Sequence, residues 1–405
     1  MKLRTAALLS FWFSVLASQP GCVLAQVSKD KAVSAGIIED QFSAKQAEKN
    51  NPSKKWLLRQ RTLLSSAVAL LGTVQTADPA AWADAGALLN YLADLPAQSS
   101  NRVISGQFIG HPNSNYAALY DQYVAGLYRQ TGYWTSLAGA DYARLSEQND
   151  PVDLSLVNAS LIQHWNQGGL VTVSWHARNP WTGGSARDKR IGKYSDLWTP
   201  GTAAYESWKK EMDQVASALA ELQAAGVTVL WRPLHESNGQ AFWWTKAKSS
   251  GDQVKLWRKM FEYFTQQKGL HNLLWVYSVV PDKSDSVRPV DYAYPGSAYV
   301  DVVGIDAYME DLQIQSDYQK LASLKKPMML SEFGPFKGSD ADKDPSLKLP
   351  HYDYSRLIQQ IRGQYPLFTA FQAWNSYWAM VSQLNAQGLF KDSWVVDRSE
   401  LSWKQ

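Results

Sequence analysis

The sequence has little cysteine, no apolar segment long enough to cross a membrane after its N-terminus, and no dense run of basic residues. Its 405 residues include one cysteine, so the chain cannot form an internal disulfide. The longest apolar stretch downstream, residues 63–74, is shorter than the roughly 20 residues that a membrane helix needs. The 40 Lys and Arg nearly balance the 37 Asp and Glu, which argues against nucleic acid as a partner.

The first 25 residues have the pattern of a secretory signal peptide. Lys2 and Arg4 precede an apolar run at residues 6–17, and small residues end at Ala25. We therefore expect a secreted or periplasmic protein whose only cysteine leaves with the signal. The alternative is a lipoprotein cleavage site between Gly21 and Cys22, with lipid attachment through Cys22.

Residues 26–77 are charged, and a polar break at residues 45–55 interrupts them. This composition predicts an N-terminal extension that is helical or partly disordered and lies outside the catalytic core.

From residue 78 to residue 405, short apolar strands alternate with longer helical stretches. Such alternation is typical of an α/β protein, and eight strands favour a single (β/α)8 TIM barrel, which we expect to be a monomer. The helices include residues 201–225, closed by Gly226, and residues 252–268. The predicted strands are residues 103–109, 124–128, 169–175, 227–234, 272–279, 299–308, 327–332 and 367–374.

Two of these strands end in a glutamate. The stretch 227–244, VTVLWRPLHESNGQAFWW, places Glu236 after an apolar run, and PMMLSEFG at 327–334 places Glu332 in the same position on its own strand. Polar residues at the C-terminal ends of barrel strands mark the catalytic mouth. Paired carboxylates suit glycoside cleavage, because one protonates the leaving oxygen and the other meets the oxocarbenium-like carbon. The 18 Trp and 20 Tyr also favour a sugar ligand, since indole faces stack on sugar rings.

These motifs resemble glycoside hydrolase family 26, the β-mannanase family of the retaining clan A. RPLHESNG followed by FWW at 242–244 resembles its acid/base motif, and SEFG at 331–334 its nucleophile motif. Residues 271–278 and 294–308, and Trp175-His176, are similar to the same family. The resemblance covers roughly residues 80–395 and implies a (β/α)8 fold that needs no metal and no cofactor.

The resemblance implies a role for each matching residue. Glu236 becomes the general acid and base, and Glu332 the nucleophile. The aromatic run after Glu236 can supply the apolar surroundings that let an acid keep its proton. Arg232 is expected to support the carboxylates, because arginine holds acids through charged hydrogen bonds. The expected substrate-binding residues are His176, His235, Trp243, Tyr308, Trp374 and Trp198.

Within that set, His235 is expected to set the protonation of the pair, and Tyr308 to donate to the nucleophile. His176 should face the sugar at the cleaved bond, with Trp374 as the floor beneath it. Weaker candidates for sugar contact are Trp181, Arg178, Gln107 and His111.

One position departs from the family pattern. Trp usually precedes the Phe-Trp-Trp run, and this chain has Ala241 there. The missing indole would hold the sugar on the leaving-group side, which leaves that subsite and the polymer preference open.

The expected function is a secreted endo-β-1,4-mannanase that acts on mannan, glucomannan or galactomannan through two glutamates. A β-1,3-xylanase and a mixed-linkage β-glucanase of the same family remain alternatives, since they would use the same carboxylates. A non-catalytic polysaccharide-binding barrel is a further alternative. A metal hydrolase built on His111, His176 and His235 is disfavoured, because no second His follows His235-Glu236 one helical turn later.

Overall fold

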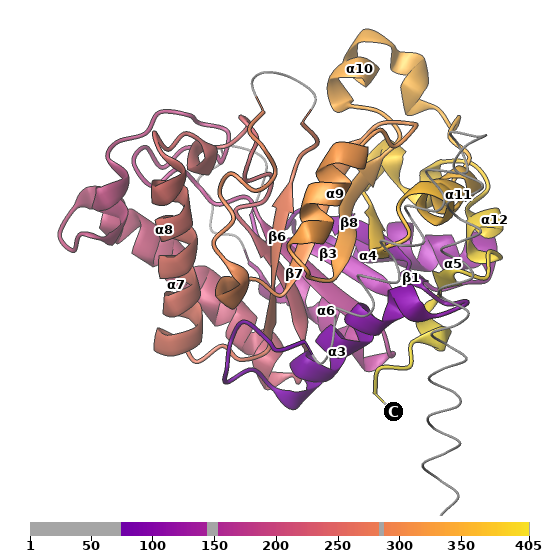
Figure 1. Cartoon of the computed structure of the whole chain (residues 1–405), viewed down its shortest axis with the longest axis horizontal. Coiled ribbons are helices and arrows are strands. Elements are labelled where there is room, and N and C mark those ends of the chain that lie inside the picture. The colour runs from indigo at the N-terminus through magenta and orange to yellow at the C-terminus, as the bar shows by residue number, and fades with distance from the viewer. Residues whose placement is uncertain (1–73, 144–152, 283–286, 405) are drawn as a thin grey trace, which may run out of the picture. The chain divides into compact units, whose positions relative to one another are not determined.

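Eight parallel strands close into a barrel in the computed structural model, which describes residues 74–143, 153–282 and 287–404 (Figure 1). The expected signal peptide and almost all of the expected extension lie outside these residues. The barrel strands, in chain order, are β2 (Gly106–Gly110), β3 (Leu137–Asp141), β4 (Leu170–Trp175), β5 (Val229–Pro233), β6 (Leu273–Val279), β7 (Val302–Tyr308), β8 (Met328–Gly334) and β9 (Phe368–Ala373).

Neighbouring strands in the sequence are neighbours in the barrel. The order runs β2-β3-β4-β5-β6-β7-β8, and β9 pairs with both β8 and β2, which closes the cylinder. Two short strands, β1 (Val103–Ile104) and β10 (Val395–Val396), pair with each other, and β1 also pairs with β9. The predicted (β/α)8 barrel is confirmed.

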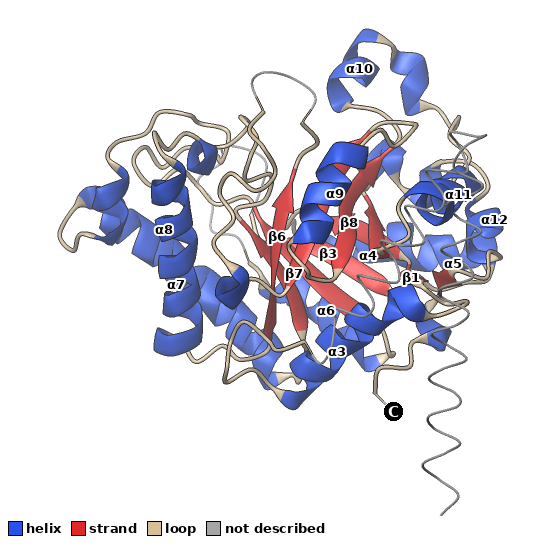
Figure 2. Ribbon diagram, viewed as in Figure 1, coloured by secondary structure: helices blue, strands red, loops and turns tan. Residues whose placement is uncertain are grey.

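Helices surround the strands (Figure 2). The longer ones, such as α7 and α8, bury the apolar face that their 3.6-residue periodicity creates. The longest, α7, begins after Thr202, whose side chain accepts the N–H of Tyr205, and it is followed by Gly226 with a φ of 76°. The described helices are α3 (Ala83–Asp94), α4 (Tyr116–Tyr120), α5 (Gly126–Thr131), α6 (Ser155–Asn166), α7 (Ala203–Ala224), α8 (Ser250–Glu262), α9 (Gln315–Ser323), α10 (Gly338–Lys343), α11 (Ser355–Gln364) and α12 (Ala386–Phe390).

The second predicted strand is wrong. Residues 124–128 end a π-helical turn, Asp121–Ala125, and begin α5, whereas the second barrel strand is β3 at Leu137–Asp141. The sequence of β3, LAGAD, is rich in small residues with low strand propensity, so burial between β2 and β4 decides its conformation.

The register of the barrel is irregular beside Glu332. Ile305 pairs with Leu330, but the next residue of β7, Asp306, pairs with Glu332. Ser331 is therefore an extra residue, as in a β-bulge, where two residues of one strand face one residue of the other. The bulge allows both Ser331 and Glu332 to interact with groups inside the barrel.

Within the described parts of the chain, we find no helix that combines the length and the apolar character of a membrane span.

Candidate active site

A cavity of about 560 Å³ opens at the C-terminal ends of the barrel strands. Its walls come from the ends of β7 and β8 and from the segments that follow β2, β4, β5, β6, β8 and β9. The lining residues are His111, His176, Arg187, His235, Glu236, Phe242, Val280, Pro281, Val287, Asp306, Tyr308, Met309, Glu332, Lys337, Gly338, Ser339, Trp374 and Trp378.

Glu332, on β8, is held by one donor from β5 and one from the neighbouring strand β7. Nη2 of Arg232 lies 2.5 Å from its Oε1, and the hydroxyl of Tyr308 donates to its Oε2 at 2.7 Å. The side chain is 5% exposed and ends in the cavity. Both partners favour the charged carboxylate, which is the form that a nucleophile needs.

Arg232 joins two carboxylates in the barrel interior. Its Nη1 donates to Oδ2 of Asp306 at 2.9 Å and to Oγ of Ser278 at 3.2 Å. Burial disfavours its charge, but Asp306 and Glu332 outweigh that effect and raise the pKa of Arg232 above its ordinary value. Arg232 therefore stays charged and contacts both carboxylates.

The backbone that carries Glu236 is strained. After β5, both Leu234 and Glu236 have positive φ angles, 47° and 51°, which are costly for residues other than glycine. The N–H of Gly239 donates to the carbonyl of Glu236 at 2.8 Å, and the indole of Trp244 donates to the carbonyl of His235 at 2.9 Å. Such strain persists only where surrounding contacts fix the conformation.

Asn238 supplies the main fixed point of this turn. Its buried amide donates to the carbonyls of Val280 and Arg288 at 2.9 and 2.8 Å and accepts the N–H of Val280 at 2.8 Å. Val280 directly follows β6, so Asn238 ties the turn after β5 to the next barrel strand.

Glu236 and Glu332 have opposite environments although they are close. One carboxylate oxygen from each, and one from Asp306, all lie within 4.8 Å of one another. Burial, together with the negative charges of Glu332 and Asp306, raises the pKa of Glu236 to about 8. Glu236 can therefore hold a proton at neutral pH beside Glu332, whose oxygens accept hydrogen bonds from Arg232 and Tyr308.

A chain of polar contacts links His235 to Asp141 through His176. Nε2 of His235 lies 3.2 Å from Nε2 of His176, whose Nδ1 lies 2.8 Å from Oδ2 of Asp141. Burial and the neighbouring His176 and Arg232 hold the pKa of His235 well below its ordinary value, so His235 is neutral. Asp141 also accepts from Ser174 Oγ at 2.6 Å.

Asp141 is the site residue that the sequence did not reveal. It ends β3, the strand that was misplaced, and its only local signal is an acid after the short run LAGA. Burial would raise the pKa of Asp141, but His176 and His111 outweigh this and place it well below the ordinary value. The ionised carboxylate fixes the ring of His176 at the cavity.

Trp374 lies flat against the barrel and faces the cavity. Its ring stacks on Phe108 with centroids 3.7 Å apart and planes 6° apart, and His111 meets its edge. Phe108 belongs to β2, so packing rather than solvent sets the orientation of the indole, in a position suited to the floor of a sugar site.

Other expected sugar contacts lie away from the cavity. Trp243 is fully buried, and its indole donates to the carbonyl of Ala177 at 2.9 Å, so it supports the site from behind. Trp198 lies on the loop before α7 with Lys255 over its ring at 4.5 Å, and Gln107 is buried with its amide on the carbonyl of Ala373.

The weaker candidates divide in the same way. Trp181 packs its ring edge-on against Trp243, at 5.6 Å between centroids, and the backbone N–H of Arg178 donates to Glu211 at 2.8 Å. Neither residue lines the cavity, whereas His111 does. The four expected residues His176, His235, Tyr308 and Trp374 are brought together with the two glutamates.

Two clusters have the residue types of a metal site, His111–Asp141–His176 and Glu236–Asp306–Glu332. In the first, Nδ1 of His111 faces the carbonyl of Ala143 at 3.1 Å, and Nδ1 of His176 faces the carboxylate of Asp141. A carbonyl and a carboxylate can only accept, so both nitrogens carry protons and are poor ligands. In the second, Arg232 already binds an oxygen of Asp306 and an oxygen of Glu332.

Two close carboxylates at the mouth of a parallel barrel, one able to hold a proton at neutral pH and one hydrogen-bonded to an arginine and a tyrosine, define the class of protein as a glycoside hydrolase. Within that class, the family profile named Glycosyl hydrolase family 26 matches residues 77–400. The chain belongs to this family, as the motifs of the sequence indicate.

Similar proteins carry mannanase names. The chain is 37% identical over 332 residues to Mannan endo-1,4-beta-mannosidase A and B of Caldalkalibacillus mannanilyticus, which covers 78% of this chain and 61% of that longer protein. It is 34% identical to a Mannan endo-1,4-beta-mannosidase of Bacillus subtilis, covering 81% of this chain and 90% of the relative. The solved structure of a Bacillus subtilis mannanase matches with a TM-score of 0.71 at 31% identity, over 82% of this chain and 97% of that one.

Proposed function

We propose that this chain is a retaining endo-β-1,4-mannanase that acts on mannan, glucomannan or galactomannan. The observation that carries the proposal is the closeness of Glu236 and Glu332, which each have one carboxylate oxygen within 4.8 Å of the other's. Retaining glycosidases have carboxyl groups about 5 to 5.5 Å apart, whereas inverting ones leave room for a water at about 6.5 to 9.5 Å. The short separation favours double displacement.

In the first step, the Glu332 carboxylate attacks the anomeric carbon while Glu236 donates its proton to the leaving oxygen. The bond from carbon to the leaving oxygen breaks, and an ester joins the sugar to Glu332. In the second step, Glu236 takes a proton from water, which attacks the same carbon and frees Glu332. Arg232 and Tyr308 stabilise the carboxylate that leaves in this step.

The names of the relatives support a mannan substrate for this chain. The alternatives from the same family, β-1,3-xylan and mixed-linkage β-glucan, use the same two glutamates, and Ala241 leaves the leaving-group subsite unlike the family pattern. Of the described residues, His176 and Trp374 are the ones that we assign to the sugar at the cleaved bond.

The test is product analysis on mannan, β-1,3-xylan and lichenan in parallel, with wild type and Glu332→Ala. Release of oligosaccharides from mannan by the wild type alone is the expected result. No release from mannan would overturn the substrate, and equal turnover by Glu332→Ala would overturn the nucleophile and favour a binding barrel. Activity should also survive a chelator; loss of activity that added metal restores would contradict a metal-free mechanism.

We further propose that the protein is secreted, on the strength of residues 1–25, and that it acts as a monomer. Mass spectrometry of the mature protein distinguishes a chain that begins at Gln26 from one that retains a lipid-modified Cys22. Sedimentation of the purified protein tests the monomer.

A further inference from the structure

Arg187 is the one basic side chain from the loop between β4 and α7 that lines the cavity. It is exposed, and its guanidinium carbon lies 5.4 Å from the centroid of the Phe242 ring. This distance is within the range of a cation–π contact, which holds the group over the ring face. Nothing in the proposed mechanism uses this charge.

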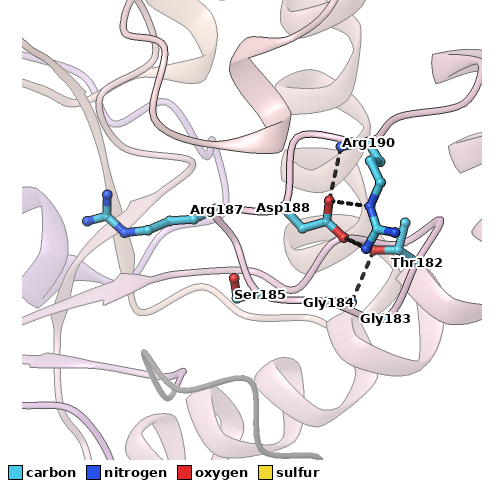
Figure 3. A pocket seen from close by; sticks show the side chains of 7 residues that line it. All are labelled: Thr182, Gly183, Gly184, Ser185, Arg187, Asp188 and Arg190. Atoms are coloured by element: carbon cyan, nitrogen blue, oxygen red, sulfur yellow. Dashed lines mark hydrogen bonds and ion pairs between the residues drawn. The ribbon is translucent and has the colours of Figure 1, made fainter.

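The loop is built to hold Arg187 in this direction. Asp188 accepts from Thr182 Oγ1 at 2.6 Å and from Arg190 at 3.0 and 2.7 Å, so the acid next in sequence is already engaged. Figure 3 shows these three residues together on one side of the loop, with the side chain of Arg187 directed away from them. Arg187 makes no ion pair with any residue that the structure describes.

The base of the loop is fixed to the acid/base strand end. The buried Ala186, which precedes Arg187, accepts the backbone N–H of Trp243 at 3.0 Å. Asn179 donates to the carbonyls of Asp188 and Arg190, both at 2.8 Å. The position of Arg187 is therefore coupled to the turn that carries Glu236.

Arg187 lies on the Glu236 side of the cavity, because the Phe242 ring beneath it contacts the ring of His235, the residue before Glu236, with centroids 4.9 Å apart. It acts on Glu236, whose pKa it lowers against burial and the neighbouring acids, and on His235. The acid of a retaining glycosidase protonates the leaving oxygen, so its side of the cavity is where the leaving sugar lies. Tyr308 and Arg232, in contrast, contact Glu332.

Ala241, directly before Phe242, packs against the core and does not line the cavity. On this side the cavity presents the ring of Phe242 with the guanidinium of Arg187 over it. We propose that Arg187 is a specificity-determining residue that binds hydroxyl groups of the sugar on the leaving-group side. This inference rests on the proposed glycosidase function, and it predicts a subsite based on charged hydrogen bonds in place of stacking.

The test compares two substrates of the wild type. One is the shortest oligosaccharide that places sugars on both sides of the cleaved bond, chosen from whichever polymer the wild type cleaves. The other is a dinitrophenyl glycoside with the same sugars on the glycone side; it has no leaving sugar and needs no proton from Glu236. The variants are Arg187→Met, which removes the charge, and Arg187→Lys, which keeps the charge but loses the planar fork.

For Arg187→Met we expect kcat/KM on the oligosaccharide to fall by about tenfold or more, as for loss of a hydrogen bond to a charged group. On the dinitrophenyl glycoside, kcat/KM should stay within about twofold of wild type, with Arg187→Lys intermediate on the oligosaccharide. The control is Lys189→Met, which removes the same charge from an exposed position of the same loop outside the cavity lining and should match wild type on both.

Equal losses on both substrates, or no loss on either, would overturn the role of Arg187. A loss as large for Lys189→Met would assign the effect to the loop's overall charge and also overturn it. The underlying function fails separately, if the wild type cleaves neither substrate or if Glu332→Ala retains turnover.

Discussion

The guanidinium of Arg232 lies between two acids, 2.5 Å from Glu332 and 2.9 Å from Asp306, and its side chain is 1% exposed. The three groups form a buried unit in which one positive charge makes ion pairs with two carboxylates. Burial raises the pKa of Asp306 against the opposing effect of Arg232. Arg232 thereby links β5 to β7 and β8 through the two acids.

Arg232→Met should destabilise the protein by about 3 to 5 kcal/mol near neutral pH, because it leaves buried acids without a counter-charge. In the variant, the folded-state pKa of Asp306 lies further above its unfolded value. The destabilisation should therefore grow as pH rises from the unfolded-state pKa of Asp306 to its folded-state pKa, and it should shrink in acid. Urea unfolding of wild type and variant at about pH 5 and about pH 8 checks this; equal differences at both pH values would contradict it.

The pKa of about 8 for Glu236 predicts that kcat/KM of the wild type falls with a basic limb near that pH, as the general acid loses its proton. Glu332→Gln removes one of the two acidic charges that raise this pKa, so the pKa of Glu236 should fall. Isotope-edited NMR of the glutamate carboxyl carbons measures it without requiring activity. Glu310→Gln, which alters an exposed acid paired with Arg356, is the control and should leave it unchanged.

Glu236→Gln should stabilise the protein in base. The pKa of Glu236 in the folded protein, about 8, exceeds the ordinary value of 4.5. Protonated Glu236 therefore contributes its full stability below pH 4.5, and the wild type loses that contribution as pH rises through about 8. Gln has no such loss. Because Glu236 keeps partial contact with solvent in the cavity, we expect a gain of about 1 to 2 kcal/mol above pH 8 and none in acid. Thermal unfolding across pH measures it, and a gain independent of pH would be the wrong result.

Tyr308→Phe should lower kcat/KM by about 10- to 100-fold, since it removes a hydrogen bond to the charged carboxylate of Glu332. The ring itself is retained, so the protein should unfold at nearly the same temperature. The matched control is Tyr377→Phe, at a tyrosine outside the cavity lining. Similar kinetics for both variants would mean that the hydroxyl of Tyr308 has no special role.

Asn238→Ala should reduce both stability and turnover. It leaves part-buried backbone groups of Val280 and Arg288 without their partner, at a cost of about 1 to 3 kcal/mol. It also frees the strained turn at Glu236, so kcat should fall while the pH profile loses its sharp basic limb. Asn238→Asp keeps an acceptor but loses both donors, so its stability and kcat should lie between those of the wild type and Asn238→Ala. Unchanged kcat in a destabilised Asn238→Ala would show that the turn holds Glu236 by other contacts.

The sequence predicted the parts of the site that lie on strongly apolar strands. Runs such as VTVLWRP and PMMLSEFG give unambiguous strands, and their terminal acids follow from the barrel rule. The placement of β3 failed because LAGAD has no strand propensity of its own, while residues 124–128 have aromatic and β-branched residues that their helical context overrides. The loss of β3 hid Asp141.

The sequence also did not predict which aromatic residues near the site are buried and which line the cavity. Trp243 and Trp244 adjoin Phe242 in sequence, yet Phe242 lines the cavity while both indoles are buried behind it. The chain after β5 is irregular, so neither a period of 2 nor one of 3.6 tells which ring faces the sugar. Arg187 was missed for the same reason, because a long loop gives its residues no predictable direction.

The extra residue Ser331 has a consequence for anyone who transfers this pair of acids to another protein. On a regularly alternating strand, neighbours point to opposite sides, so a designed barrel that copies Glu332 without its bulge would turn the carboxylate away from Arg232. A successful graft must copy an irregularity in strand length as well as the side chains. An idealised scaffold, chosen for its regularity, would be a poor host.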